Sequence, residues 1–591
     1  MGHAQRRRTR RRLATVIASV TLLTGTVLGI GTLPASASAA PDSTTQSDST
    51  TLPAPDNPAM DTVAAMQPSW NLGNTLDAIP TETSWGNPLV TKQLFDTLKA
   101  QGFRSVRIPV TWSGHQSATA PYAIDPAWMA RVKQVVDWAI QDGLYVDLNV
   151  HHDSWQWIEY MPTDHDNVLA CFKATWTQIA AEFKDEPHKL LFESVNEPQF
   201  KDASGASVSD AVSEQCLDEL QTAFFTIVRH SGGRNDTRGL ILFPINNDQS
   251  GLDGLAAEIA SLHDPYLVAT IHNYGFWPFT VNIAGYDTFN AQVQQDMLDL
   301  FSRAYNAFVA KGVPVYMGEY GTFKYPDYTH DYNAIEPGEG DKFFEMFAYE
   351  ARINHVTTAL WDPGNFLNRS TFQPRDPALW TLIQSSWKTR SGTASTDQLF
   401  VPKSGPITAR TIGLNLDGTT FKGLSAGDWS LVKGRDYAID GDQLTLTAAT
   451  VARLAGNQAY GVDSTLTVRF SRGVPWTVNV LTNGPVTQAD ATGDTTAGLA
   501  IPTQFNGDVP AEMEAKYADG SGAGPASWTT YQEFGVSFVP SASGNTITMT
   551  PAFLQAIKDG VPVTLTFYYW SGATTTYTVT KTGTTVTGSH A

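Results

Sequence analysis

The chain of 591 residues is poor in cysteine and in positive charge. Cys171 and Cys216 are its only cysteines, which excludes a fold held by several disulfides and leaves one disulfide or two buried thiols open. Lysine and arginine number 39 against 58 aspartates and glutamates, a net charge of −19. That charge argues against nucleic acid or an anionic membrane surface as a partner. An acidic globular chain of about two to four domains remains.

Long apolar runs are also scarce, and the one that could enter a membrane lies at the N-terminus. Six arginines fall within residues 6–12, an apolar stretch covers 13–33, and small-residue cleavage motifs follow at 35–39. This order is typical of a secretory signal peptide, which we assign to residues 1–40. A retained membrane anchor is the alternative. The paired arginines leave the Sec and the twin-arginine export routes open.

Composition then divides the chain. Residues 41–59 read as a Ser/Thr/Pro linker. Residues 60–386 alternate apolar strands with helical patterns, and eight such units in about 320 residues predict a closed (β/α)8 TIM barrel. A doubly wound open sheet is the runner-up, but it would need a glycine-rich phosphate loop in place of Gly73-Asn74-Thr75-Leu76. The strand candidates are 68–72, 104–110, 145–151, 190–196, 239–245, 267–273, 313–319 and 357–361.

After Trp387 the helical periodicity fades and alternating, threonine-rich strands take over. Residues 387–405 read as a second linker. Beyond it the chain repeats itself weakly, because the strand pattern of residues 466–471 is echoed by residues 565–570. We therefore predict two tandem all-β immunoglobulin-like sandwich modules, at 406–482 and 484–583.

The repeat also separates the two modules by their expected roles. Strand side chains alternate between faces, so Arg469 and Ser471 should point outward in the first module, and Tyr568 and Trp570 in the second. Adjacent outward aromatics form a flat surface on which a sugar ring can stack. We interpret the second module as carbohydrate-binding and the first as a spacer. Covering of the aromatics by a loop or a neighbouring domain is the alternative. The expected binding residues are Trp528, Tyr531, Tyr568 and Trp570.

Two glutamates stand at the ends of apolar strands of the predicted barrel. Glu197 follows Asn196 and precedes Pro198, and Glu319 stands in Met317-Gly318-Glu319-Tyr320-Gly321. Carboxyls at the C-terminal ends of parallel strands point into a shared cleft. Two such carboxyls are what glycoside hydrolysis needs, since one protonates the leaving oxygen and the other attacks or steadies the sugar carbon. The acid, Glu197, should have a raised pKa so that it arrives protonated.

Seven of the eight predicted strand ends supply polar or aromatic groups to the same face. Among them, His151-His152-Asp153 could suggest a metal. No ligand spacing such as H-E-x-x-H accompanies it, so we expect no metal and no cofactor, with a structural ion as the alternative.

Together these motifs resemble glycoside hydrolase family 5 over residues 60–386, and specifically so. The segments Trp70-Asn71-Leu72-Gly73-Asn74-Thr75-Leu76-Asp77-Ala78 and Glu82-Thr83-Ser84-Trp85-Gly86-Asn87-Pro88 are similar to its subfamily 4, which is rich in endo-β-1,4-glucanases and xyloglucanases. More loosely, the C-terminal half resembles an immunoglobulin-like X2 module followed by a family 46 carbohydrate-binding module.

The resemblance implies that Glu197 is the acid/base and Glu319 the nucleophile. Arg107 and Tyr274 would keep the nucleophile ionised and aimed, because a cation and a hydroxyl donor both favour the charged form. Glu193, one layer deeper, is interpreted as a structural carboxylate.

The resemblance also implies a set of sugar contacts. Asn196 would bind the sugar 2-hydroxyl, Trp361 would floor the subsite on the non-reducing side of the cleaved bond, and Asn74 would contact a more distant sugar. His152 and His272 would shape the hydrogen bonds near that bond. The expected substrate-binding set is Asn74, Arg107, His151, His152, Asn196, His272, Tyr274 and Trp361.

The sequence thus predicts a secreted, monomeric, retaining endo-β-1,4-glucanase that hydrolyses plant cell-wall β-glucan. A β-mannanase or exo-glucosidase of the same barrel clan, and a non-catalytic glycan-binding protein, are the alternatives. Intact glutamates at both positions speak against the last. The preferred glucan stays open, as do the endo or exo mode and whether the last module binds alone or completes the catalytic cleft.

Overall fold

The computed structural model describes residues 57–590, so the predicted signal peptide and nearly all of the first linker lie outside the described residues. Helix α1 (Pro58–Ala65) begins inside the segment predicted as linker. The Asn57 side chain caps it by accepting from the Ala59 amide, and it donates to the Gly312 carbonyl at 2.6 Å. Residues 58–59 therefore belong to the barrel, and the linker prediction is wrong for them. Within 57–590, no helix combines the length and the apolar character needed to cross a membrane.

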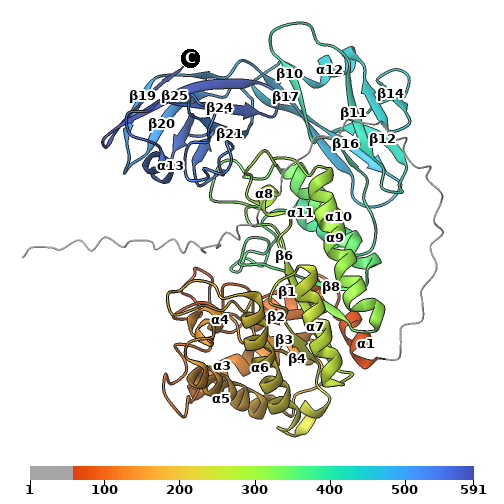
Figure 1. Ribbon diagram of the computed structural model, residues 1–591. Helices are drawn as coiled ribbons and strands as arrows, with labels where there is room; N and C mark the ends of the chain where they lie inside the picture. The colour runs from red at the N-terminus through yellow and green to blue at the C-terminus, as the bar shows by residue number, and fades with distance from the viewer. Residues whose placement is uncertain (1–56, 591) are drawn as a thin grey trace, which may run out of the picture. The chain divides into compact units, whose positions relative to one another are not determined.

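Eight parallel strands close into a barrel in chain order, with helices around them (Figure 1). Strand β8 pairs with β1, placing Ala359 opposite Ser69, and this closure excludes the open doubly wound sheet. The predicted fold class is confirmed, and every predicted strand segment contains an observed strand or overlaps one. The strands are β1 (Ser69–Asn71), β2 (Ser105–Ile108), β3 (Tyr145–Asn149), β4 (Leu190–Glu193), β5 (Leu240–Leu242), β6 (Leu267–Asn273), β7 (Val315–Tyr320) and β8 (Val356–Leu360).

The barrel helices follow the apolar spacing of the sequence. In α3, Asp125 caps the first turn, Pro126 starts it, and Val132, Val136 and Ala139 face the barrel. The α-helices from α2 onward are α2 (Lys92–Ala100), α3 (Pro126–Gln141), α4 (Asp153–Gln156), α5 (His165–Phe183), α6 (Asp210–Arg229), α7 (Gln249–Leu262), α8 (Trp277–Thr280), α9 (Ala291–Ala307), α10 (Pro337–Ile353) and α11 (Pro377–Ser386). Short 3-10 turns are η1 (Ile158–Tyr160), η2 (Gly233–Asp236) and η3 (Val309–Lys311).

The first C-terminal module is a sandwich of a five-stranded and a four-stranded sheet, ordered β10-β17-β16-β12-β13 and β14-β15-β11-β9. Its elements are β9 (Thr393–Ala394), β10 (Gln398–Pro402), β11 (Arg410–Asn415), β12 (Phe421–Ala426), β13 (Trp429–Ser430), β14 (Tyr437–Asp440), β15 (Gln443–Leu446), α12 (Ala448–Leu454), β16 (Gly461–Phe470) and β17 (Trp476–Asn483).

The segment 387–405, predicted as a linker, is structured. It contains β9 and β10, and the latter pairs in parallel with β17. Leu399 and Val401 of β10 are buried in the module core, and Trp387 packs edge-on against Phe103 of the barrel at 4.9 Å. The linker prediction is wrong here because these strands are short and sit among Ser, Thr and Gly residues, so their alternation is hidden.

The second module is also a two-sheet sandwich, ordered β18-β20-β23-β22 and β19-β26-β25-β24-β21. Strand β26 lies wholly beyond residue 583, the predicted end of this module, and it belongs to the module because it pairs with both β25 and β19. Its elements are β18 (Thr487–Gln488), β19 (Ala491–Asp494), β20 (Leu499–Gln504), β21 (Pro510–Lys516), β22 (Phe538–Ser541), β23 (Thr546–Met549), α13 (Pro551–Ala556), β24 (Val563–Tyr569), β25 (Thr574–Thr582) and β26 (Thr585–His590).

Three carboxyl groups are buried or half-buried and form no ion pair with another residue of the described range 57–590. Burial raises the pKa of Glu258 on α7 to about 9. Burial likewise raises the pKa of Asp341 on α10 to about 8, and that of Glu512 on β21 to about 8. A carboxyl with such a pKa holds its proton through most of the neutral range.

Cys171 and Cys216 are both free thiols, which decides between the two alternatives left by the sequence. Burial raises the pKa of Cys171 to about 11 and also raises the pKa of Cys216. We therefore predict that a reducing agent leaves the melting temperature of the purified protein unchanged. Thiol titration after denaturation without reductant should find both groups. A thiol count near zero would contradict the structure.

Candidate active site

The two predicted catalytic glutamates meet at the C-terminal end of the barrel. Glu319 lies in β7 and its side chain is 4% exposed, whereas Glu197 lies in the turn after β4 and its side chain is 47% exposed. Glu197 has a φ of 38°, a conformation uncommon outside glycine. One carboxylate is thus held inside the barrel mouth and the other opens to the cleft.

The two carboxyls are close together, with His272 between them. The Nδ1 atom of His272 lies 2.8 Å from Oε1 of Glu197 and 3.7 Å from Oε2 of Glu319, and one ligand atom from each of the three residues lies within 4.8 Å of the others. This spacing fits the carboxyl separation of about 5–5.5 Å in retaining glycosidases, and not the roughly 6.5–9.5 Å of inverting ones.

Glu319 is held by one charged and one neutral donor. Arg107 Nη1 donates to its Oε1 at 2.7 Å, and the Tyr274 hydroxyl donates to its Oε2 at 2.5 Å. Burial and the negative charge of Glu319 raise the pKa of Tyr274 well above its usual value, so this hydroxyl keeps its proton and remains a donor. Both oxygens of Glu319 are therefore fixed in direction.

Arg107 organises the floor of the site. It is completely buried and binds Glu193 with two parallel hydrogen bonds of 2.6 and 2.9 Å. It also donates to the side-chain oxygens of Asn71 and Asn196, at 3.1 and 2.7 Å. Although burial alone would lower it, the charges of Glu193 and Glu319 raise the pKa of Arg107 well above its usual value. Glu193 has the structural environment expected of it.

A third carboxyl, Asp147 on β3, lies against the same guanidinium. Its Oδ2 is 3.5 Å from Arg107 Nε, and neither of its oxygens has a hydrogen-bond partner among residues 57–590. Burial and the charge of Glu193 raise the pKa of Asp147 well above its usual value. Burial therefore disfavours the ionised form of Asp147, whereas at Glu193 the charge and hydrogen bonds of Arg107 together outweigh burial and lower the pKa of that carboxyl.

Glu197 departs from the sequence expectation. Partial burial opposes the shift, but the hydrogen bond from His272 lowers the pKa of Glu197, whereas the sequence predicts a raised pKa. The reason is geometric: the imidazole of His272 contacts the carboxylate of Glu197 directly at 2.8 Å.

The predicted sugar-contacting residues surround this pair. The Asn196 side-chain oxygen is taken by Arg107, and its amide nitrogen has no hydrogen-bond acceptor in the described part of the chain. His151 stacks parallel to Trp361 at 5.9 Å, and burial lowers the pKa of His151 well below its usual value, so it is neutral. Trp361 in turn lies on Gly73, where a Cβ atom would come within 3.0 Å of the indole. A larger residue at this position would push the indole of Trp361 away from its place.

The first strand end also enters the site. Asn74 has a φ of 54°, and its backbone amide donates to Asp77 at 3.1 Å. The same Asp77 carboxylate lies 3.5 Å from Nε2 of His152. Asp77, His151 and His152 thus form a compact group, but Asp153 is not part of it, because its carboxylate accepts from the Trp112 and Ser113 amides.

Three aromatic residues at the site were not singled out from the sequence. Trp85 and Trp155 flank the ring of His152, with centroids 5.2 and 4.9 Å away. Phe323, which is 51% exposed, stacks on Tyr274 at 4.9 Å. Trp155 and Phe323 each follow a recognised motif by a few residues, and Trp85 lies inside the segment 82–88 that carries the resemblance to subfamily 4. A large aromatic residue close to a catalytic strand end, at a position that the core does not need, is the sequence signal that indicates such a site residue.

In the second module the four predicted aromatics differ in exposure. Trp528 is 54% exposed and lies 6.3 Å from Trp277 in α8 of the barrel. Tyr531 and Tyr568 form a tilted pair with ring centroids 6.1 Å apart, and Tyr568 donates to Glu514 at 2.8 Å. Tyr568 and Trp570 are half-buried. The outward Arg469 and Ser471 of the first module are exposed, as predicted.

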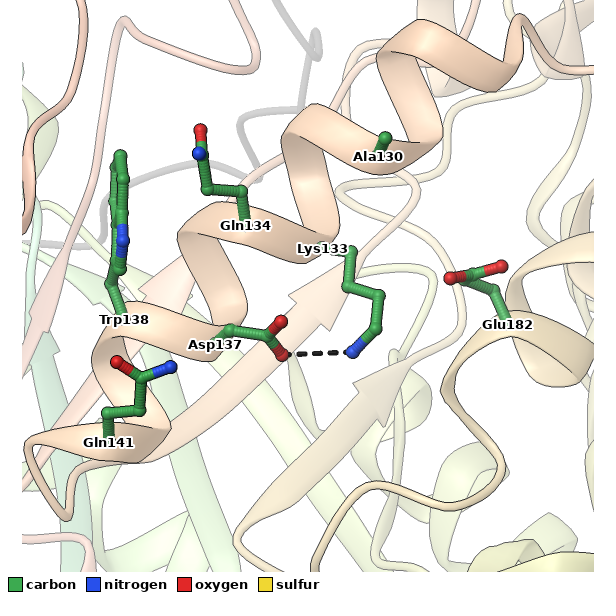
Figure 2. Close-up of a pocket in the computed structure, with 7 residues that line it drawn as sticks. All are labelled: Ala130, Lys133, Gln134, Asp137, Trp138, Gln141 and Glu182. Atoms are coloured by element: carbon green, nitrogen blue, oxygen red, sulfur yellow. Dashed lines mark hydrogen bonds and ion pairs between the residues drawn. The ribbon is translucent and has the colours of Figure 1, made fainter.

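A surface hollow elsewhere on the barrel carries none of these groups. It lies along the outer face of α3 and next to α5, where Lys133 and Asp137 form an ion pair of 3.0 Å (Figure 2). Its lining is Ala130, Lys133, Gln134, Asp137, Trp138, Gln141 and Glu182.

A closed parallel barrel with two close carboxyls at its strand ends defines a glycoside hydrolase. Comparison with known families agrees. The model for cellulase (glycosyl hydrolase family 5) matches residues 71–366, that for carbohydrate binding domain X2 matches 393–480, and that for the CBM46 carbohydrate binding domain matches 483–589. The chain belongs to glycosyl hydrolase family 5.

Relatives share the whole arrangement. Endoglucanase B of Paenibacillus lautus is 44% identical over 539 residues, which cover 90% of this chain and 94% of that protein. The tri-modular endo-β-1,4-glucanase B of Bacillus halodurans is 41% identical, with a TM-score of 0.87 over 90% of this chain and 99% of that one. A tri-modular subfamily 4 enzyme of Bacillus licheniformis is 29% identical, with a TM-score of 0.75 over 89% and 100%. The resemblance seen in the sequence is confirmed.

The geometry predicts that the two glutamates fail differently when changed. Glu197→Gln should keep much of its kcat/KM on dinitrophenyl cellobioside, whose leaving group needs no proton, and lose about 10²–10⁴-fold in kcat/KM on polysaccharide. Its kcat on the activated substrate should fall, because the variant has no base to take the proton of the attacking water. Glu319→Gln should be inactive on both substrates, since it has no attacking group. The values of kcat/KM on the two substrates measure this difference, because they report the first step alone.

Glu182→Gln, in the outer hollow, is the matched control and should behave as the parent on both substrates. Equal loss on both substrates in Glu197→Gln and Glu319→Gln would contradict the assignment of roles.

Proposed function

We propose that this enzyme is a secreted, monomeric endo-β-1,4-glucanase that hydrolyses β-glucans by double displacement with retention. The observation that carries the proposal is the Glu197–Glu319 pair, close enough for a covalent intermediate, with Glu319 bound by Arg107 and Tyr274. Endoglucanase is also the name of the relatives that share all three modules.

In the first step, an oxygen of Glu319 attacks the anomeric carbon. The bond from that carbon to the leaving sugar breaks, and Glu197 gives its proton to the leaving oxygen. In the second step, water gives a proton to Glu197 while its oxygen attacks the same carbon and releases Glu319. Arg107 and Tyr274 orient Glu319 throughout, so little reorganisation is needed as its charge is spent and regained.

Glu197 acquires its acid character from the substrate in this scheme. In the free enzyme His272 donates to it and lowers its pKa. A sugar bound between the two side chains takes over that hydrogen bond and excludes water from the carboxyl. Burial then dominates, and burial raises the pKa of a carboxyl. Substrate binding therefore raises the pKa of Glu197, so that the carboxyl is protonated when it acts as the acid.

Several exposed aromatics support a long, neutral substrate. Trp155 is 43% exposed and Phe323 is 51% exposed, and they lie beside His152 and Tyr274 respectively. Sugar faces stack on such rings. Sites spread along a chain favour cleavage inside a polymer. A polymer cannot cross a membrane, which agrees with the export signal expected at residues 1–40.

The last module extends this row of aromatics. Trp528 is its most exposed aromatic and stands near Trp277 of the barrel, so we assign this pair to a sugar beyond the barrel subsites. Tyr531 is set back: a Cβ atom at Gly285 of the barrel would lie 3.4 Å from its ring. The module thus adds to the catalytic cleft, and is not solely a separate anchor.

Retention of configuration tests the mechanism. Proton NMR of the earliest products from a β-glucan should show the β-anomer first, with the α-anomer appearing only by mutarotation. An α-anomer as the initial product would mean that Glu319 is not a nucleophile and that the enzyme inverts.

Trp528→Ala should weaken hydrolysis of β-glucan or xyloglucan several-fold, because a stacked aromatic contributes about 1 kcal/mol or more. It should leave dinitrophenyl cellobioside unchanged, since that substrate fills only barrel subsites. Trp570→Ala should act in the same direction but less. Tyr460→Ala, at an exposed tyrosine of the first module, is the control. Parental rates of Trp528→Ala on every polymer would show that the pair with Trp277 is only packing.

A further inference from the structure

The two residues that meet at the nucleophile come from neighbouring strands. Tyr274 directly follows β6, and Glu319 lies near the end of β7. Each strand continues into a long loop, residues 274–290 after β6 and residues 321–336 after β7. Residues of both loops contact the last module before the chain returns to the barrel helices α9 and α10.

Asn282 joins the two loops to that module. Its side-chain amide donates to the carbonyl of Ala334, in the second loop, at 2.7 Å and to the carbonyl of Ala511, in the module, at 2.9 Å. Its own carbonyl accepts from the Phe534 amide at 3.2 Å. Asn282 is 3% exposed and has a φ of 52°, so a single buried residue connects three segments.

The loop after β7 is attached to the module along its length by polar contacts. Lys324 Nζ forms an ion pair with Glu533 and donates to the Phe534 carbonyl at 2.7 Å. Asp331 accepts from the Ser541 hydroxyl at 2.7 Å and from the Ser543 amide at 3.0 Å.

The loop after β7 also makes apolar contacts with the last module. The ring of Tyr332 lies 5.6 Å from that of Phe505. Ala334 is 4% exposed and is part of the apolar core of the module. This stretch of the barrel loop therefore completes the packing of a different domain.

The loop residues that contact the module lie next to residues that contact Tyr274 and Glu319. Phe323, next to Lys324 in the chain, stacks on Tyr274 with an interplanar angle of 20°, and the Tyr274 hydroxyl is 2.5 Å from Glu319. Because Phe323 is half exposed, the barrel core does not enclose it, and its place over Tyr274 depends on where the loop is fastened.

We propose that the last module is a structural part of the catalytic centre, because it fastens both loops and so sets Tyr274 against Glu319. Asn282 and Lys324 are positioning residues in this arrangement. The proposal rests on the proposed function, in which Glu319 is the nucleophile. Displacements of about 1 Å at a reacting group can cost on the order of 10²-fold in rate. Loosening either attachment therefore lowers catalysis even for a substrate that never touches the module.

The test uses the full chain and a small substrate. Asn282→Gly removes the amide but keeps the left-handed backbone, and Lys324→Met removes the ion pair. We expect kcat on dinitrophenyl cellobioside to fall about fivefold or more while KM stays within about twofold. Inactivation by an activated cellobioside fluorinated at its second carbon should slow equally, since it reports attack by Glu319 alone.

Rescue and controls separate positioning from general damage. Lys324→Arg should restore most of the lost kcat, because it keeps the charge. Gln458→Gly, another left-handed position, and Lys558→Met, on the same module, should match the parent. All rates are measured well below the melting temperature of each variant.

Unchanged kcat on the small substrate in both Asn282→Gly and Lys324→Met would overturn the proposal. If Asn282→Gly does not fold, the comparison of Lys324→Met with Lys324→Arg decides alone. A parent enzyme without activity on dinitrophenyl cellobioside or β-glucan would instead refute the proposed function.

Discussion

The guanidinium of Arg107 is the group on which both the barrel interior and the chemistry depend. A buried cation without partners would cost on the order of several kcal/mol or more, so it has to be surrounded by acceptors. The acceptors come from different strands: Asn71 from β1, Glu193 from β4 and Glu319 from β7. The same hydrogen bonds that make the cation tolerable inside the barrel therefore fix the nucleophile. Because the same hydrogen bonds of Arg107 serve folding stability and catalysis, a substitution that removes them changes both.

The barrel and its glutamates could be predicted because their signals are local. Each barrel strand is a short apolar run, and both glutamates follow such runs directly, so the strand ends mark them without knowledge of the partners. The sandwich modules were visible through alternation and the echo between residues 466–471 and 565–570. Features that depend on a few consecutive residues, such as these strands and the glutamates at their ends, can be predicted from the local sequence pattern.

The remaining features depend on residues far apart in the chain. The lowered pKa of Glu197 arises from His272, 75 positions away, and nothing near Glu197 announces it. Strands β9 and β10 pair with β11 and β17, and residues 387–405 by themselves, without those partners, predict a linker. Asn282 looks like any loop asparagine, and only the folded chain shows that it meets Ala334 and Ala511. Phe323 is important because it stacks on Tyr274, and the sequence does not show that contact.

The buried carboxyls change what the acidity of this chain means. The formal charge of −19 counts every aspartate and glutamate as ionised. Glu258 and Asp341 hold protons in the folded protein near neutral pH, because burial raises their pKa values to about 9 and about 8. Folding near neutral pH therefore takes up protons from the solvent. The folded enzyme carries less negative charge than its unfolded chain, and its surface repels other anions, including charged polymers of the plant wall, less strongly than its composition suggests.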